Sequence, residues 1–592
     1  MHLGRINMMK KLTGKMKSLD DHKKFDVAVA HSEFLRVDVL CRACIKRGMS
    51  AKAMIGLLNK AVNGLYKPKG VTETELLRAK VFSNIAGSRA LQILHRSTGA
   101  LSDRTVRRHT VTPPLWVLVA APTVEEVQFN VSNTFGGGGR DMPTGAAVET
   151  SSLNVPGYQL MIDKIKVEGR PRWDDKTNMI LGVAREDALK VGLEFSSMAE
   201  VDALLDAIKG GDVRLAVEAT VAAIGLLSDN SKVYAARPVV VSGTCKTEDA
   251  MTHAKLIQTV IDGCKNVPGC LYSLASDGEA RRGAAFVRLT HKAKLSPNSP
   301  IYAYIGLLHL LNQLVGDDDI TSDKDYKHIF KCLRNALLRE MGIMIYGFHM
   351  QPSVLEFQLC SAGVPPHQVS YLLNPEDKQD VILAYKLLRH IWRMPPAGAN
   401  TRPGFASARK YICILGDFFR HLISPYIDPK MSLRDQLFHL SVATHLMCSL
   451  YMHPAGGNAF LPKVLHTDIQ IMIKNTFFSV AKAKVNRPCG EFYIILLGTD
   501  RLEVTFGYIR SVVGSNANTD IYQLGGRIAA LTNTAQILAD HSEWDSGTRR
   551  LHLPPLDSEE DITSKSDHVN PASWQGNVNV QHVLPVTAWN KG

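Results

Sequence analysis

The sequence of 592 residues contains no long hydrophobic run. Its most apolar stretch, residues 301–315, is shorter than a membrane span and includes His309, Asn312 and Gln313. The lysine-rich amino terminus lacks the apolar segment of a secretory signal peptide. That terminus predicts either a nuclear-import or DNA-contacting arm or simply a solvated helix. We therefore expect no membrane segment.

Cysteine is scarce and irregularly spaced, with ten residues in the chain and only one close pair, Cys41 and Cys44. A zinc site of four ligands would need a second pair nearby, and none follows. The pattern indicates reduced thiols and an intracellular protein. Four consecutive glycines, 136–139, lack the spacing and the Lys-Ser/Thr pair of a phosphate-binding loop. We interpret them as a linker.

The composition is that of a folded protein with several domains. Hydrophobic residues make up 45% and charged residues 21%, and one domain per about 150 residues is the ordinary expectation. The formal net charge of +13 favours an anionic partner, for which nucleic acid is the commonest choice. The alternative is a basic surface that serves only solubility.

Local patterns divide the chain into six parts. Alternating or strongly apolar segments at 158–169, 237–244 and 269–278 predict strands, and 178–185 is a candidate hairpin partner of the first. Longer periodic segments predict helices. The expected parts are a helical region 1–110, a Gly/Pro-rich connector 111–157, an α/β unit 158–283, an all-helical segment 284–490, a short strand and helix within 491–544, and an irregular tail 545–592.

The end of the helical region suggests a helix-turn-helix. A helix stops near Thr98 and Gly99, and a second helix starts after Ser102 or Asp103 as its cap. The second helix would present basic side chains to DNA bases or phosphates. The candidates are Arg104, Arg107 and Arg108.

Three acids stand at positions that could share one site. Asp163 lies in the first strand, Asp277 follows a later one, and Glu503 lies on a helix after a long interruption. Around one sheet they would form an oxygen-rich site for two divalent metals, which suits phosphodiester hydrolysis and strand transfer. The alternative is that they are surface or capping acids, with Thr499 or Asp500 as the N-cap of the last helix.

Four blocks of sequence carry a resemblance to a known family. Residues 160–182, 275–283, 318–335 and 496–510 resemble, in order and character, the P-element-like superfamily of cut-and-paste DNA transposases in its fungal form. The resemblance implies an α/β RNase H-like catalytic core, interrupted by a large all-α insertion domain and preceded by the helix-turn-helix-like region. It covers about residues 75 to 530.

The resemblance also implies roles for individual residues. The two aspartates of the family fall on Asp163 and Asp277 and its glutamate on Glu503, as ligands of Mg²⁺ or Mn²⁺. Arg510 would be available to phosphate, and a solvated arginine is the alternative. The family's insertion binds guanine nucleotide, so GTP is a candidate cofactor here, although a solvated basic face is an equally open interpretation. The nucleotide-site candidates are Asp500, Asp325, Lys327, His328, Lys331, Arg334 and Asn335.

Two departures from the family pattern affect these expectations. Lys164 stands beside Asp163 where many relatives have glutamate, and strand alternation predicts that it points to the other face. The chain also has no amino-terminal zinc-coordinating THAP module, which leaves the device that recognises DNA ends open.

The sequence thus predicts a nuclear DNA transposase that acts on DNA as a homo-oligomer through a DDE site. One alternative is a catalytically inactive or domesticated DNA-binding protein derived from a transposase. The other is a helical nucleotide-binding protein whose α/β part is only structural.

Overall fold

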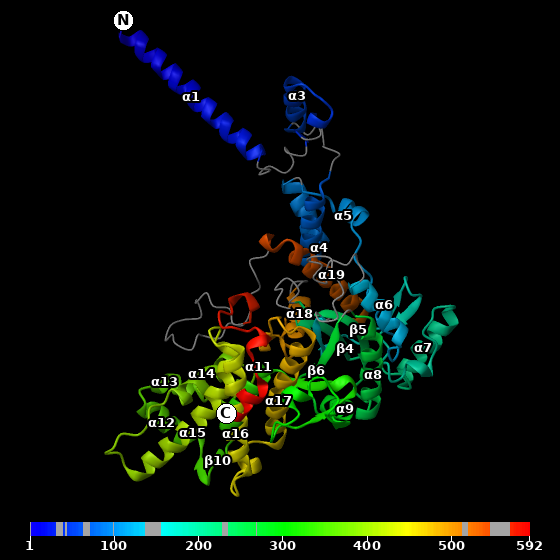
Figure 1. Ribbon diagram of the computed structural model, residues 1–592. Coiled ribbons are helices and arrows are strands. Elements are labelled where there is room, and N and C mark those ends of the chain that lie inside the picture. Colours follow the sequence, from blue (N-terminus) through cyan, green and yellow to red (C-terminus); the bar gives the residue numbers. More distant parts are fainter. Residues whose placement is uncertain are drawn as a thin grey trace. The chain divides into compact units, whose positions relative to one another are not determined.

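The computed structural model divides the chain into two compact units, Met1–Val111 and Thr112–Gly592, which are described separately (Figure 1). The glycine run 136–139 and residues 545–568 of the predicted tail lie outside the residues that the structure describes. The structure describes residues 2–30, 40–41, 44–62, 71–98, 100–135, 155–227, 235–267, 269–511, 519–544 and 569–592.

The first unit is helical, as predicted. Its small core includes Leu91 and Val106, and Ser102 caps the last helix by accepting a hydrogen bond from the backbone N–H of Thr105 at 3.2 Å. A sharp bend interrupts the long helix α4 at Gly87, where φ is 82°. The predicted pair of helices on either side of Gly99 is therefore present. The helices are α1 His2–Ala30, α3 Ala51–Val62, α4 Glu73–Thr98 and α5 Asp103–His109.

A five-stranded mixed sheet forms the centre of the second unit. Its strand order is β5-β4-β1-β6-β9. β4 runs antiparallel to both β1 and β5, whereas β6 is parallel to β1 and to β9, so β4 alone runs against the others. The strands are β1 Gly157–Lys166, β4 Glu218–Leu227, β5 Arg237–Thr244, β6 Cys270–Ser276 and β9 Thr321–Lys324.

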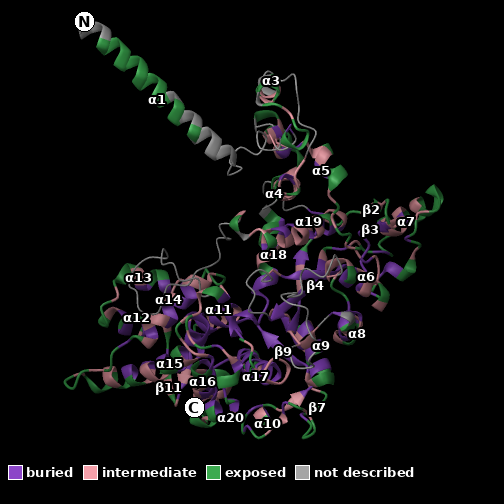
Figure 2. Cartoon of the chain, turned by 45° about the horizontal axis from the view of Figure 1, so that its top comes forward, coloured by how far each residue is buried: buried purple, intermediate pink, exposed green. Residues whose placement is uncertain are grey.

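Helices cover both faces of this sheet, and Figure 2 shows its strands largely buried (Figure 2). Leu160 and Ile162 of β1 pack in one core, toward α6, α8 and α9. Met161 and Ile165 of the same strand pack in the other core, toward α18 and α19. Alternation along β1 thus assigns even and odd residues to opposite faces. The helices are α6 Val124–Phe135, α8 Ala250–Gly263, α9 Ala280–Thr290, α18 Asp500–Ser511 and α19 Ile521–Asp540.

The partner of β1 differs from the predicted one. The expected hairpin between 158–169 and 178–185 is wrong, because β1 pairs with β4. The segment 178–185 contributes β3 Met179–Leu181, which pairs with β2 Arg172–Asp174. α7 Met198–Gly210 follows before the chain returns to the sheet.

The segment expected to be wholly helical also contains strands. β9 lies within residues 284–490 and completes the central sheet. It consists of Thr321, Ser322, Asp323 and Lys324, all buried, and so has no apolar signature. The remaining short strands are β7 Ala293–Lys294, β8 Leu314–Val315, β10 Ile343–Ile345 and β11 Phe348–Met350.

The rest of this segment forms a helical region with one large core. Leu387, Phe418, Leu440 and Ile473 are fully buried there. No helix among the described residues is apolar over a length that would cross a bilayer. The helices are α10 Tyr302–Ile305, α11 Tyr326–Leu337, α12 Pro352–Ser361, α13 Pro366–Leu372, α14 Val381–Trp392, α15 Pro403–Ile427, α16 Leu433–Met452 and α17 Lys463–Asn486.

Two expectations near the carboxyl terminus are corrected. Ile494–Leu496 form a short 3-10 helix instead of the predicted strand. Part of the predicted irregular tail is folded, because α20 Pro585–Lys591 packs on the helical core. Trp589 is buried there and donates a hydrogen bond from Nε1 to the carbonyl of His309 at 2.8 Å.

Candidate active site

Acidic residues lie at matching register positions on three neighbouring parallel strands of the sheet. Ile162 pairs with Ser276, and Ser276 pairs with Lys324, so the next residue of each strand is an aspartate. These are Asp163 within β1, Asp277 directly after β6 and Asp325 directly after β9. The register therefore brings Asp163 and Asp277 together, as the sequence predicted, and adds Asp325.

Glu503 reaches this edge on α18. Leu502 and Phe506 of α18 are buried in the same core as Met161. Asp163 lies on the same face of β1 as Met161, because the two residues are two positions apart in the strand. The inward packing of Phe506 sets Glu503 close enough to Asp163 for the two carboxylates to repel each other.

The acids raise one another's pKa values. Burial, then repulsion from Asp277, raises the pKa of Asp163 to about 6, although the guanidinium of Arg282 opposes the shift. Burial of the carboxyl group and repulsion from Asp325, Asp500 and Asp163 raise the pKa of Glu503 to about 8, even though the residue retains exposed surface. Burial and mutual repulsion therefore both favour the protonated forms of Asp163 and Glu503.

A buried arginine lies between the first two acids. The Nη1 atom of Arg282 is 3.0 Å from Asp277 Oδ1 and 3.6 Å from Asp163 Oδ1, and it donates to the carbonyl of Ile162 at 2.7 Å. Its Nη2 atom donates to Glu279 Oε2 at 3.1 Å. Sequence reasoning missed this residue, because nothing local distinguishes Arg282 from the adjacent Arg281.

Lys164 points away from Asp163, as strand alternation predicts. Its Nζ atom lies 2.7 Å from Glu279 Oε1, and only its backbone N–H contacts Asp163, donating to Oδ1 at 2.7 Å. Burial alone would raise the pKa of Glu279, but the hydrogen bond from Lys164 and the charge of Arg282 hold it below its ordinary value. Lys164 therefore acts on the site through Glu279 and Arg282.

Two aspartates fix the start of α18. The backbone N–H of Gly498 donates to Asp323 Oδ2 at 2.7 Å, and that of Thr499 donates to Asp325 Oδ2 at 3.3 Å. Asp325 also caps α11 by accepting from the backbone N–H of His328 at 3.0 Å. Asp323 was not predicted, because a buried acid in a short polar strand has no recognisable sequence signal. These contacts determine where the helix of Glu503 begins.

The residues predicted for guanine nucleotide make contacts within the protein. Lys327 Nζ lies 2.6 Å from Asp500 Oδ1 and so joins α11 to α18. Arg334 is buried and donates to the backbone carbonyls of Leu372, Asn374 and Asp377. Guanine-nucleotide binding stays a prediction. The other contacts are Lys331 with Gln379 Oε1 at 3.4 Å, Asn335 with the Lys378 carbonyl at 3.4 Å, and His328 Nε2 with Cys332 Sγ at 3.3 Å.

The predicted DNA contacts are exposed. Arg104, Arg107 and Arg108 lie on α5, and Arg510 lies in the last turn of α18. Arg107 pairs with Asp103 at 2.9 Å. Exposed cations of this kind are available to phosphate. DNA contact by these residues stays a prediction.

The acid cluster suits a divalent metal in its donor chemistry. Mg²⁺ prefers carboxylate oxygen, and Asp163, Asp277 and Glu503 supply it. Repulsion between neighbouring carboxylates contributes to the raised pKa values of Asp163 and Glu503, after burial, and a cation between them would offset that repulsion. Across the described part of the chain, however, no three acidic, histidine or cysteine side chains are already arranged around a common metal position.

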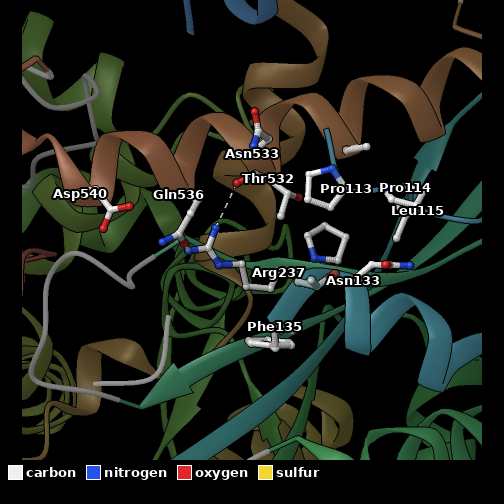
Figure 3. A pocket seen from close by; sticks show the side chains of 13 residues that line it. Pro113, Pro114, Leu115, Asn133, Phe135, Arg237, Thr532, Asn533, Gln536 and Asp540 are labelled. Carbon is white, nitrogen blue, oxygen red and sulfur yellow. Dashed lines mark hydrogen bonds between the residues drawn. The ribbon is translucent and has the colours of Figure 1, made fainter. Parts of the chain in front are cut away.

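One well-formed pocket lies away from these acids. Figure 3 shows Arg237 between α6 and α19, with its guanidinium donating to the Thr532 carbonyl at 3.3 Å and to Gln536 Oε1 at 2.9 Å (Figure 3). The pocket has a volume of about 200 Å³, and Pro113, Pro114 and Phe135 also line it. None of the residues predicted for catalysis, nucleotide or DNA lines this pocket.

Comparisons with known proteins give a structural likeness but no match in sequence. No protein-family model matches the sequence, and no curated protein does. Among solved structures, the Drosophila P element transposase strand transfer complex is similar at 14% identity and a TM-score of 0.49, over 82% of this chain and 96% of that chain. A likeness at this level carries no conclusion about the activity of this chain.

Proposed function

We propose that the chain is a transposase-like enzyme that cleaves and transfers DNA strands through Asp163, Asp277 and Glu503. The observation that carries the proposal is the parallel register of Ile162 with Ser276, which makes Asp163 and Asp277 neighbours. α18 then brings Glu503 to the same edge. Paired carboxylates at one sheet edge are the donor set that metal-dependent phosphodiester chemistry requires.

The strand order supports an RNase H-like core in this proposal. Only β4 runs against its neighbours, and the acids lie on β1 and directly after β6 in the middle of the sheet. We assign α12 to α17 to an insertion that separates this sheet from α18. In the sequence, this insertion begins after β9 and α11 and ends before the 3-10 helix Ile494–Leu496.

Asp163, Asp277 and Glu503 would hold Mg²⁺ or Mn²⁺. When bound, such an ion lowers the pKa of a water nucleophile and offsets charge on the phosphate. The protein's own contribution is to position the carboxylates. Asp323 and Asp325 fix the first residues of α18 through the N–H groups of Gly498 and Thr499.

DNA is the proposed substrate and partner. The net charge of +13 and the exposed arginines of α5 support it. We also propose action in the nucleus as a homo-oligomer, because strand transfer joins two DNA ends. These last two points follow from the proposed activity.

A second candidate is an inactive DNA-binding derivative of such an enzyme. The observation that favours it is the guanidinium of Arg282, which already lies against Asp163 and Asp277. This candidate predicts DNA binding that weakens steeply with salt, without cleavage.

Cleavage of labelled DNA that carries the sequences flanking the gene separates the two candidates. The assay compares the unmodified chain with Asp277→Asn and Glu503→Gln in Mg²⁺ and in Mn²⁺. Asp202→Asn is the matched control, because Asp202 is an exposed acid on α7. Cleavage that is lost in both site variants and kept in the control supports the enzyme. Binding without cleavage in either metal would instead identify the inactive derivative.

A further inference from the structure

The acid site contains its own cation. Arg282 exposes only 1% of its side chain, and its Nη1 atom contacts Asp277 and Asp163 at 3.0 and 3.6 Å. A divalent ion shared by these two carboxylates would need the space and the charge interaction that this nitrogen already uses. The guanidinium and such an ion therefore cannot both bind the pair in this arrangement.

The position of Arg282 is held by groups outside the acid pair. Its Nη1 atom also donates to the Ile162 carbonyl at 2.7 Å, and its Nη2 atom donates to Glu279 at 3.1 Å. Its Nε atom is buried with no acceptor among the described residues. The two terminal nitrogens therefore carry all the contacts that keep the guanidinium against Asp163 and Asp277.

Lys164 reinforces the arrangement from the other face of β1. Its ammonium contacts Glu279 Oε1 at 2.7 Å, while Arg282 contacts Glu279 Oε2. Three carboxylates, Asp163, Asp277 and Glu279, thus face two cations. Lys164 holds the Glu279 carboxylate in place, so that Glu279 in turn holds Arg282 in place.

We propose that Arg282 is a built-in counter-ion that competes with divalent cations for Asp163 and Asp277. Glu279 and Lys164 hold its guanidinium in position. The inference rests on the proposed function only in taking these two acids as metal ligands. The unmodified chain binds Mn²⁺ weakly in the absence of DNA, because an ion must first displace the guanidinium. Removal of the guanidinium leaves the acids repelling each other, and Mn²⁺ then stabilises them.

Mn²⁺ binding to the full chain tests this directly. Electron paramagnetic resonance measures free Mn²⁺, and thermal unfolding with and without Mn²⁺ gives an independent readout. Arg282→Gln binds Mn²⁺ at least about tenfold more tightly than the unmodified chain. Its melting temperature is lower without metal and rises with Mn²⁺, whereas that of the unmodified chain does not respond.

Controls locate the effect. Arg288→Gln removes an exposed arginine from the same helix, α9, and leaves Mn²⁺ binding unchanged. Asp277→Asn, added to Arg282→Gln, abolishes the gain. If Arg282→Gln does not fold, Glu279→Gln removes one anchor of the guanidinium and shows a smaller gain in the same assay.

Two results would overturn the inference. One is an unmodified chain that binds Mn²⁺ as tightly as Arg282→Gln, and the other is a gain that survives Asp277→Asn. Neither measurement depends on DNA cleavage. If Arg282→Gln gains Mn²⁺ binding but the chain never cleaves DNA, the role of Arg282 is supported and the proposed activity is refuted. If the unmodified chain cleaves DNA and also binds Mn²⁺ tightly, the proposed activity is supported and the role of Arg282 is refuted.

Discussion

Lys327 and Asp500 form an ion pair of 2.6 Å between helices that are 173 residues apart in sequence. Both side chains are about nine-tenths buried. Lys327 lies on α11, next to the last strand of the sheet, and Asp500 is the first residue of α18. The pair therefore connects the two ends of the helical region directly at the acid site.

Removal of one partner from this pair should be costly. Lys327→Ala leaves the Asp500 carboxylate without its ammonium partner, and we expect a loss of about 3 kcal/mol in the free energy of unfolding. Urea titration followed by fluorescence measures it. Lys209→Ala breaks an exposed pair with Asp206 on α7 and should change the same quantity by less than about 0.5 kcal/mol. Equal effects from the two variants would contradict a structural role for the buried pair.

Glu503 gives the stability of the chain a defined pH dependence. Its pKa rises from an ordinary 4.5 to about 8, so the folded chain binds this proton more tightly than the unfolded chain. Stability should therefore fall as the pH rises from about 4.5 to about 8, because the folded state must ionise Glu503 at a cost. Melting temperatures without divalent cations should decline over this window, and Glu503→Gln should flatten the decline. A profile that Glu503→Gln leaves unchanged would rule out this source.

Gly498 occupies a position that no other residue fits. Its φ is 89°, and a Cβ there would lie 2.8 Å from Asp325 Oδ2. We expect Gly498→Ala to cost about 1–3 kcal/mol and to lower the proposed cleavage by displacing α18. Gly507→Ala, within α18 itself, is the matched control, because a Cβ at Gly507 meets nothing within 4 Å. That substitution should stabilise the helix by up to about 1 kcal/mol. The prediction fails if both variants behave alike in urea unfolding.

The folded carboxyl-terminal segment should contribute to the helical core. Trp589 is 2% exposed and packs edge-on against Phe477 of α17. Trp589→Ala should lower the free energy of unfolding by about 3–5 kcal/mol, since it leaves a cavity. Leu584→Ala, at a 60% exposed position, is the control and should have little effect. Faster amide hydrogen exchange in α16 and α17 would show that the loss of stability extends to the helical core.

Sequence patterns were sufficient where the structure is locally determined. β1, β5 and β6 were predicted because each has its own apolar pattern and end signals. β4 was missed because helices cover both of its faces, so its sequence is a continuous apolar run without alternation.

The site was only partly predictable for a related reason. The three acids could be placed from their strands and helix, but Arg282 depends on the packing of α9 against β1 and β6. β9 is polar because its side chains bond across the sheet; Asp323 accepts from Gln159 at 2.7 Å. Gln159 and Asp323 lie 164 residues apart in the sequence, so no local pattern reveals that they are partners.

The bond between Asp323 and Gly498 also sets an order of events during synthesis. These residues are 175 positions apart, and at about 5–20 residues per second the ribosome needs roughly 9–35 s to make the chain between them. All five strands of the sheet have emerged well before α18 exists. Asp163 and Asp277 are therefore synthesised many seconds before Glu503, and the acid site can be completed only near the end of translation.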